Sequence, residues 1–494
     1  MNRTIPAYLL AVLLFALPAH AGFQHAELDL PGKILEVLTA DIDGQGAPEV
    51  LVLYRQGLEP DESIFLQLYS YENAEFQPLK KLSPPEGAAF FDIADVDADG
   101  AEEIVYITPG TIIAQEPDGG SLRSIVDIDT FALAPDPQHL PYQDFARDWT
   151  GENVTSMLVP GRGDMVLLKP DPNGEYRQVS SMDIEIRAYN DSQGQAVHGW
   201  AWNSYVSNVT IPSIMLEDVD ADGLRDLCFA YTDQVWVHRA RKGPEGVSFS
   251  KAPDIQKRFE IRNDQELQLG NMAVITVLTQ IDEDGKADAA VLKYGGGLRD
   301  MRSRLEVHLG NGSGFSEEPD YALDYEGVAP NPRIADLNLD GGADLILPYT
   351  KIGVFELIQV LTTGAVDVDY NIYLYNGNGL YPQEPDLTPT AKYLVDYRIG
   401  ISLVGITPDF SGDFNSDGRP DLLYGLDKHR AAVSLGVDDD KLFGKPAEIF
   451  EIEPTLAVIV KELNGDDADD LIFFYPFNPD LDKKVILLIN DKNW

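Results

Sequence analysis

The feature that most constrains this fold is an acidic nine-residue motif that recurs along the whole chain. Each copy reads acid–x–Asp/Asn–x–Asp–Gly–x–x–Asp/Glu, with a few departures, and an apolar, β-prone run follows it. Successive copies begin 49 to 77 residues apart. Such self-similarity is typical of a protein built from repeats of one small unit. Seven clear copies occupy residues 41–49, 95–103, 218–226, 280–288, 336–344, 413–421 and 462–470, and a weaker eighth copy occupies 148–156.

The spacing of the oxygen-bearing residues within the motif indicates calcium coordination. A hard cation takes six to eight oxygen ligands at about 2.3–2.6 Å, and alternate residues of a tight loop direct their side chains to a common point. Positions 1, 3, 5 and 9 would supply side-chain oxygens, and the glycine at position 6 permits the turn. The weaker copy has Thr150 and Ser156 at positions 3 and 9, so it is the least suited to hold an ion.

We therefore predict calcium ions in up to seven loops. A helix–loop–helix calcium hand is excluded because it needs a Glu at position 12, where this chain has apolar or aromatic residues such as Val52 and Leu347. The predicted ligands are Asp41, Asp43, Gln45, Glu49, Asp95, Asp97, Asp99, Glu103, Asp218, Asp220, Asp222, Asp226, Gln280, Asp282, Asp284, Asp288, Asp336, Asn338, Asp340, Asp344, Asp413, Asn415, Asp417, Asp421, Glu462, Asn464, Asp466 and Asp470.

A second alternating segment and a turn follow each apolar run. Residues 305–315 (LEVHLGNGSGF) and 371–381 (NIYLYNGNGLY) carry the Asn-Gly and Gly-Ser-Gly turns that are typical of β-hairpins. Each repeat therefore holds four strands, of which one precedes the motif, one follows it, and two form a hairpin. Four-stranded units at this period predict the blades of a β-propeller.

In these motifs and strands the chain resembles the FG-GAP or VCBS repeat family, whose calcium-loop blades also occur in integrin α-subunit propellers. The resemblance covers residues 22–494 and implies ions in the loop between the first and second strand of each blade. The expected fold class is all-β, a single propeller of eight four-stranded blades, or of seven if the unit around 148–156 is an insertion. The departures from the family pattern are Gln45, Gln280 and Asp467, and they bear on individual sites.

The two ends of the chain indicate how the ring closes. The last repeat stops after its third predicted strand, 484–490, and Gly22-Phe23 matches the Gly-Phe that begins the fourth strand elsewhere, as at Gly314-Phe315. We predict that the N-terminal strand completes the last blade, because this pairing removes two free sheet edges.

The first 21 residues have the features of a secretory signal peptide, with Arg3, an apolar run and Ala19-His20-Ala21 at the cleavage site. Cys228 is the only cysteine, so we expect an exported bacterial protein without an internal disulfide, secreted or periplasmic. The 82 acidic and 37 basic residues give a net charge of −45, which argues against nucleic acid as a partner. We expect a monomer with no membrane span.

Two long insertions, 189–208 and 351–369, and an arginine group are candidate ligand surfaces. Aromatic residues concentrate at recognition surfaces, and guanidinium groups suit carboxylate ligands. The alternative is that the aromatics pack on their own loop and the arginines pair with neighbouring acids. The candidate residues are His198, Trp200, Trp202, Tyr205, Arg299, Arg302 and Arg304.

Together these features predict a binding or interaction module for a carbohydrate or protein partner. The sequence contains no nucleophile elbow and no phosphate loop, and its histidines lack the spacing of a metal-binding helix, so we predict no catalytic residue. The alternative is a calcium-dependent polysaccharide lyase or hydrolase, because calcium-loop propellers also resemble the scaffold of some pectin-type lyases. A subunit of a larger surface assembly is a third possibility.

Overall fold

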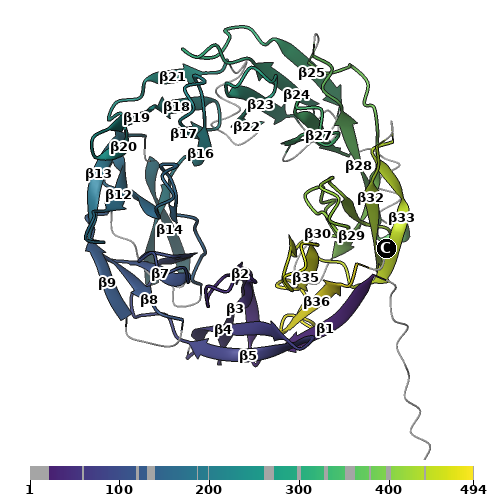
Figure 1. The fold of residues 1–494 in the computed structure, drawn as a ribbon, viewed down its shortest axis with the longest axis horizontal. Coiled ribbons are helices and arrows are strands. Elements are labelled where there is room, and N and C mark those ends of the chain that lie inside the picture. Colours follow the sequence, from purple (N-terminus) through teal and green to yellow (C-terminus); the bar gives the residue numbers. More distant parts are fainter. Residues whose placement is uncertain are drawn as a thin grey trace, which may run out of the picture.

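The apolar runs that follow the acidic motifs form strands, and the sheets that contain them stand side by side in a ring (Figure 1). The computed structural model describes residues 22–57, 61–117, 122–130, 139–185, 187–197, 200–260, 272–296, 302–326, 332–350, 362–377, 380–396, 402–438 and 441–492. Over these ranges the chain is almost entirely β, and eight antiparallel sheets form the blades. The predicted eight-bladed propeller is confirmed.

We number the blades in chain order. Blade 1 contains β2 (Lys33–Ala40), β3 (Glu49–Gln56), β4 (Ser63–Glu72) and β5 (Glu75–Leu82); blade 2 contains β6 (Phe90–Ala94), β7 (Glu103–Thr108), β8 (Thr111–Gln115) and β9 (Leu122–Asp127). Blade 3 contains β10 (Ala146–Arg147), β11 (Ser156–Pro160), β12 (Asp164–Pro170) and β13 (Tyr176–Asp183); blade 4 contains β16 (Ser213–Glu217), β17 (Asp226–Tyr231), β18 (Gln234–His238) and β21 (Ile255–Arg258).

The second half of the ring follows the same order. Blade 5 contains β22 (Met272–Thr279), β23 (Asp288–Gly295), β24 (Arg302–His308) and β25 (Tyr321–Glu326); blade 6 contains β26 (Arg333–Ala335), β27 (Asp344–Tyr349), β28 (Ala365–Tyr373), β29 (Thr390–Asp396) and β30 (Ser402–Val404). Blade 7 contains β31 (Leu422–Gly425), β32 (Arg430–Gly436) and β33 (Phe443–Glu451); blade 8 contains β34 (Val458–Lys461), β35 (Asp470–Phe474), β36 (Lys484–Asn490) and β1 (Phe23–Asp29).

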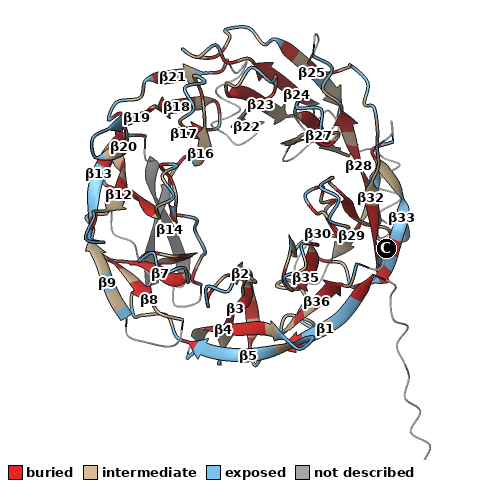
Figure 2. Ribbon diagram, viewed as in Figure 1, coloured by how far each residue is buried: buried red, intermediate tan, exposed pale blue. Residues whose placement is uncertain are grey.

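The hydrophobic core lies between the blades. Every residue of β7 and of β17 is buried, as expected for strands covered on both faces, whereas the outer strand β5 is mostly exposed (Figure 2). Among the described residues the buried side chains form eight clusters, and each cluster joins two neighbouring blades. The ring is therefore stabilised by side-chain packing between neighbouring blades, which are separate sheets and share no strand pairing over the described residues.

The ring closes as the sequence predicts. Strand β1 pairs antiparallel with β36, from Phe23 opposite Asn490 to Asp29 opposite Lys484, so the two ends of the chain share blade 8 (purple beside yellow in Figure 1). The Phe23 side chain then packs against Phe414 and Phe450 of blade 7, with ring centroids 6.1 and 5.7 Å apart. Closure therefore joins the last two blades as well as the two termini.

Blades 6 and 7 depart from the predicted four strands. β30 pairs with β29 and adds a fifth strand to blade 6, and blade 7 keeps three strands. The segment that should begin blade 7 contains Pro408, which has no N–H to donate to a ladder. This segment pairs with blade 7 through an isolated bridge between Asp409 and Leu423, and Asp421 N–H donates to the carbonyl of Gly412 at 2.7 Å.

The two insertions have different outcomes. Residues 189–197 lie in β14 (Arg187–Val197) and 200–208 in β15 (Trp200–Thr210), two antiparallel strands between blades 3 and 4 in the sequence; residues 198 and 199 lie outside the described residues. Most of 351–369 lies outside the described residues, but Thr362 and Thr363 are helical and 365–369 belong to β28. A smaller hairpin, β19 (Ala240–Gly243) with β20 (Gly246–Phe249), lies in blade 4 between β18 and β21. Within the described ranges, no helix has the length and apolar character needed to cross a membrane.

Candidate metal centres

The eight acidic loops share one backbone conformation. In seven blades the loop connects the first and second strands, and in blade 7 it precedes the first strand, β31. Positions 4 and 6 have positive φ in all eight loops, at 52–78° and 55–97° respectively. Glycine at position 6 relieves that strain in six loops, with Asn153 and Asp467 in the other two. Position 4 holds Ala, Glu, Leu or Ser as well as Gly, so the motif does not predict this second left-handed residue.

The acid at position 1 holds the turn together. In six loops its carboxylate accepts the backbone N–H of position 6, at 2.7–3.0 Å. The weaker loop is one of the six, because Asn153 N–H donates to Asp148 at 2.7 Å. The loop conformation is therefore present even where the predicted ligands are poor.

The acid at position 9 is buried and ties the loop to the sheet. In all seven clear copies it accepts the N–H of position 2, at 2.7–3.2 Å, and in the weaker copy the Ser156 hydroxyl accepts the same bond from Trp149. Where position 9 is Asp, its second oxygen accepts another N–H from a residue that is the last of the next strand in the sheet or lies two residues beyond it. The five pairs are Asp226 with Ala240, Asp288 with Gly310, Asp344 with Tyr375, Asp421 with Gly436 and Asp470 with Asn490.

These position-9 groups lie where burial opposes their charge. Burial raises the pKa of Asp288 to about 6 and that of Asp470 to about 7, although backbone N–H donors act in the opposite direction. Burial, with smaller contributions from Asp97 and Glu116, raises the pKa of Glu103 to about 7. The predicted ninth ligand therefore has a structural role that the motif alone does not reveal.

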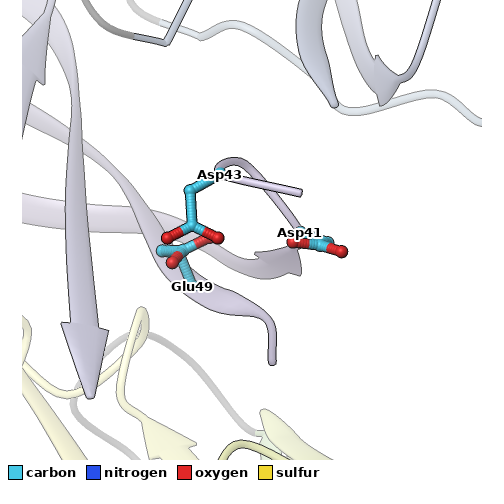
Figure 3. Close-up of side chains that lie close together, drawn as sticks. All are labelled: Asp41, Asp43 and Glu49. Atoms are coloured by element: carbon cyan, nitrogen blue, oxygen red, sulfur yellow. The ribbon is translucent and has the colours of Figure 1, made fainter. Parts of the chain in front are cut away.

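Three loops bring three carboxylates together closely enough to share a cation. The groups are Asp41, Asp43 and Glu49 in blade 1 (Figure 3), Asp95, Asp97 and Asp99 in blade 2, and Asp218, Asp220 and Asp226 in blade 4, with one oxygen from each residue within 4.8 Å of the others. A further group joins Asp97 and Glu103 to Glu116, which lies after β8 and outside the motif. Among the described residues the other loops form no such group.

Each of these three loops also contains a buried oxygen without a hydrogen-bond donor. The atoms are Asp41 Oδ1, Glu103 Oε1 and Asp220 Oδ1. A buried acceptor without a donor is costly, and clustered carboxylates repel one another. The donor set, all hard oxygen, fits calcium in these three loops and is consistent with the predicted ligands there.

Protein groups take up motif oxygens in these three loops, where Gln45 donates to Asp43, Arg123 pairs with Asp97 and Arg239 pairs with Asp220, and also in other loops. Asn338 and Asn415 each donate to the position-5 Asp and accept its N–H in return, and Lys286 pairs with Asp284. In the weaker loop, Lys169 pairs with Glu152 at position 5, and Asp148 accepts three backbone N–H groups and the Thr150 hydroxyl. These contacts place cationic or amide groups where the motif predicts an ion.

Only some of the candidate ligand-surface residues lie in the part of the chain that the structure describes. His198 and Arg299 lie outside the described residues, and Trp200, Trp202 and Tyr205 belong to β15. Arg302 is exposed at the start of β24. Arg304 is paired with Glu306 at 2.7 Å and with Asp324 at 2.6 Å, so it follows the alternative of pairing with neighbouring acids.

Glu306 of blade 5 is surrounded by basic side chains. It is 8% exposed and pairs with Lys293 as well as Arg304, and His308 Nε2 lies 3.6 Å from it. Burial alone would raise the pKa of Glu306, but His308, Lys293 and Arg304 together lower it from 4.5 to about 2. The ionised carboxylate is therefore the form that the folded chain stabilises.

Glu306→Gln should lower the free energy of unfolding at pH 7 by about 1–3 kcal/mol, because Lys293 and Arg304 lose a charged acceptor. A folded pKa below the ordinary value contributes stability above pH 4.5 that is lost as the pH falls toward 2. The difference between the variant and the wild type, measured by urea unfolding, should therefore shrink between pH 5 and about pH 2. A difference that is independent of pH would contradict this role, and Glu318→Gln, at an exposed acid of the same blade, is the control.

The sequence matches no known family model and no curated protein. Among solved structures it is similar to Sqt1 from Chaetomium thermophilum, with 10% identity, a TM-score of 0.45, and coverage of 95% of this chain and 99% of that one. It is also similar to BBS1N in complex with ARL6DN, with 10% identity, a TM-score of 0.36 and coverage of 95% and 97%. A protein from Lactobacillus plantarum shows 10% identity, a TM-score of 0.31 and coverage of 83% and 98%.

Proposed function

We propose that this chain is an exported calcium-binding β-propeller that acts as a binding module for a carbohydrate or protein partner. The observation that carries the calcium proposal is the group of loops in blades 1, 2 and 4. Each gathers three carboxylates and has a buried oxygen without a donor, as at Asp41 and Asp220. The side-chain oxygens of these loops would hold the ion, which in blades 2 and 4 would replace the guanidinium groups of Arg123 and Arg239 at Asp97 and Asp220.

The chain's own residues give such a module its rigidity. The loops join the first and second strands in seven blades and precede β31 in blade 7, and the position-9 acids fix them to the buried strands that follow. An ion in a loop would therefore stiffen one face of the ring, and calcium sites of the extracellular type bind at about 10⁻⁴–10⁻³ M. Export, which residues 1–21 predict, would provide that concentration of calcium.

The proposal is tested by counting bound ions on the chain from residue 22 onward. Calcium titration of the metal-free chain, followed by native mass spectrometry, should show at least three ions. Combining Asp43→Asn, Asp97→Asn and Asp220→Asn should remove about three ions, whereas Glu245→Gln, Glu318→Gln and Glu384→Gln, at exposed acids outside the loops, should remove none. A wild-type chain that binds no calcium would contradict the proposal.

The partner is tested with neutral and acidic polysaccharides in calcium. Retention on a polysaccharide without new products would support a binding module. Formation of unsaturated products would instead favour the lyase alternative. For a protein partner, co-purification from the native host is the corresponding experiment.

A further inference from the structure

The acidic group of blade 2 includes one residue that the motif does not predict. Carboxylate oxygens of Asp97, Glu103 and Glu116 lie within 4.8 Å of one another. Asp97 and Glu103 are positions 3 and 9 of the loop, whereas Glu116 directly follows the third strand, β8. The group therefore spans two separate segments of the blade.

Blades 1 and 2, where position 9 is Glu, lack a donor that the five blades with Asp at position 9 have; in blade 1 the corresponding residue is Tyr71. In the five blades with this donor, the residue after position 9 has a pairing partner on the adjacent strand. The residue two positions after that partner in the sequence donates its N–H to the position-9 carboxylate. In blade 5, for example, Ala289 pairs with His308, and Gly310 N–H donates to Asp288 at 2.7 Å. In blade 2, Ile104 pairs with Gln115, so the corresponding residue is Pro117.

Proline has no N–H, so residue 117 cannot donate to Glu103. Glu103 is fully buried at 0% exposure, and one of its oxygens accepts the N–H of Val96 at 2.9 Å. The other oxygen, Oε1, is buried and has no hydrogen-bond partner. This oxygen is an observation beside the acidic group that points to a ligand, because a buried carboxylate oxygen without a donor is costly unless it is protonated or meets a cation.

Blade 3 also has a proline at this backbone position, but it has a different residue at position 9 of its loop. Met157 pairs with Leu168, so the corresponding residue is Pro170, again without an N–H. There position 9 is Ser156, whose single oxygen accepts from Trp149 and donates to the carbonyl of Arg147. Because serine has a single side-chain oxygen, position 9 of blade 3 has no second oxygen that could lack a donor. Blade 2 has Glu103 at position 9, with Glu116 nearby.

We propose that blade 2 holds a calcium site in which Glu103, Glu116 and Asp97 are direct ligands. In this site Pro117 has no N–H to donate, and Glu103 Oε1 is therefore available to the ion. The inference rests on the calcium-binding function proposed above and extends it to a ligand outside the loop. Arg123 is the internal competitor, because its Nη2 lies 2.9 Å from Asp97 and 3.9 Å from Glu116. A divalent ion with hard oxygen ligands has to displace that guanidinium from Asp97.

The test compares Glu116→Gln and Pro117→Ala with two matched controls in the full chain from residue 22. Pro170→Ala is the control for the proline, because Ser156 offers no second oxygen for a restored N–H. Glu175→Gln is the control for the charge, at an exposed acid outside the group. The two readouts are calcium affinity by titration with native mass spectrometry, and melting temperature in chelator and in calcium.

Glu116→Gln should weaken the binding of one ion about tenfold and leave the other ions unchanged. Pro117→Ala should weaken the same ion, and in chelator it should melt above Pro170→Ala, because the restored N–H satisfies Glu103 Oε1. If the wild type binds calcium but both variants bind every ion with wild-type affinity, the blade 2 site is wrong and the general calcium proposal stands. If Pro117→Ala lowers the melting temperature in both conditions without a change in affinity, Pro117 has only a structural role and the inference is also overturned. If the wild type binds no ion, both proposals fail.

Discussion

Removal of calcium should lower the melting temperature of this protein by about 4–8 °C. Calcium at about 10 mM is roughly 10 to 100 times the dissociation constant of extracellular-type loops, so each occupied loop contributes about 1.4–2.7 kcal/mol. Three loops gather the carboxylates needed to hold an ion, which gives a total of about 4–8 kcal/mol. The unfolding entropy of a chain of this length is about 1 kcal/mol per degree, so the shift in degrees is numerically similar.

Differential scanning calorimetry in chelator and in calcium measures this shift directly. Magnesium at the same concentration is the control for charge screening, because it demands a stricter octahedral geometry than the loops provide. The variant that combines Asp43→Asn, Asp97→Asn and Asp220→Asn should lose most of the calcium-dependent shift. A melting temperature that is indifferent to chelator would exclude calcium as a stabilising ligand.

Phe23→Ala should lower the free energy of unfolding by about 3–5 kcal/mol, because truncation of a buried aromatic leaves a cavity. Phe23 is 4% exposed and packs on Phe414 and Phe450 of blade 7, while its backbone lies in blade 8. The substitution therefore weakens the contact between the first strand of the chain and the last two blades. Urea unfolding at fixed calcium measures the change.

Gln24→Ala is the matched control, since Gln24 is the next residue of the same strand and is exposed. It keeps the backbone pairing of β1 with β36 and should change stability by less than about 0.5 kcal/mol. Equal effects of the two substitutions would mean that the N-terminal strand does not close the ring through this buried contact.

Several details of the fold follow directly from sequence patterns. The predicted strand 484–490 coincides with β36, and the N-terminal Gly-Phe begins β1 as expected. The weaker unit forms blade 3 because its loop keeps the same turn, with Asn153 donating to Asp148. The prediction of four strands failed in blade 7, where Pro408 interrupts the inner strand.

By itself the sequence predicted the frame of each acidic loop and the closure of the ring, and it favoured eight blades while leaving seven open. These properties depend on local spacing, apolar periodicity and turn residues, which are written along the chain. Only the tertiary structure decided which loops gather oxygens and which are satisfied by the protein itself. That outcome depends on partners from other strands, such as Lys169 beside Glu152, Gly310 N–H at Asp288, and the missing N–H of Pro117 beside Glu103. The motif shows which oxygens could bind an ion, but neighbouring N–H groups and side chains determine which of these oxygens already have a partner.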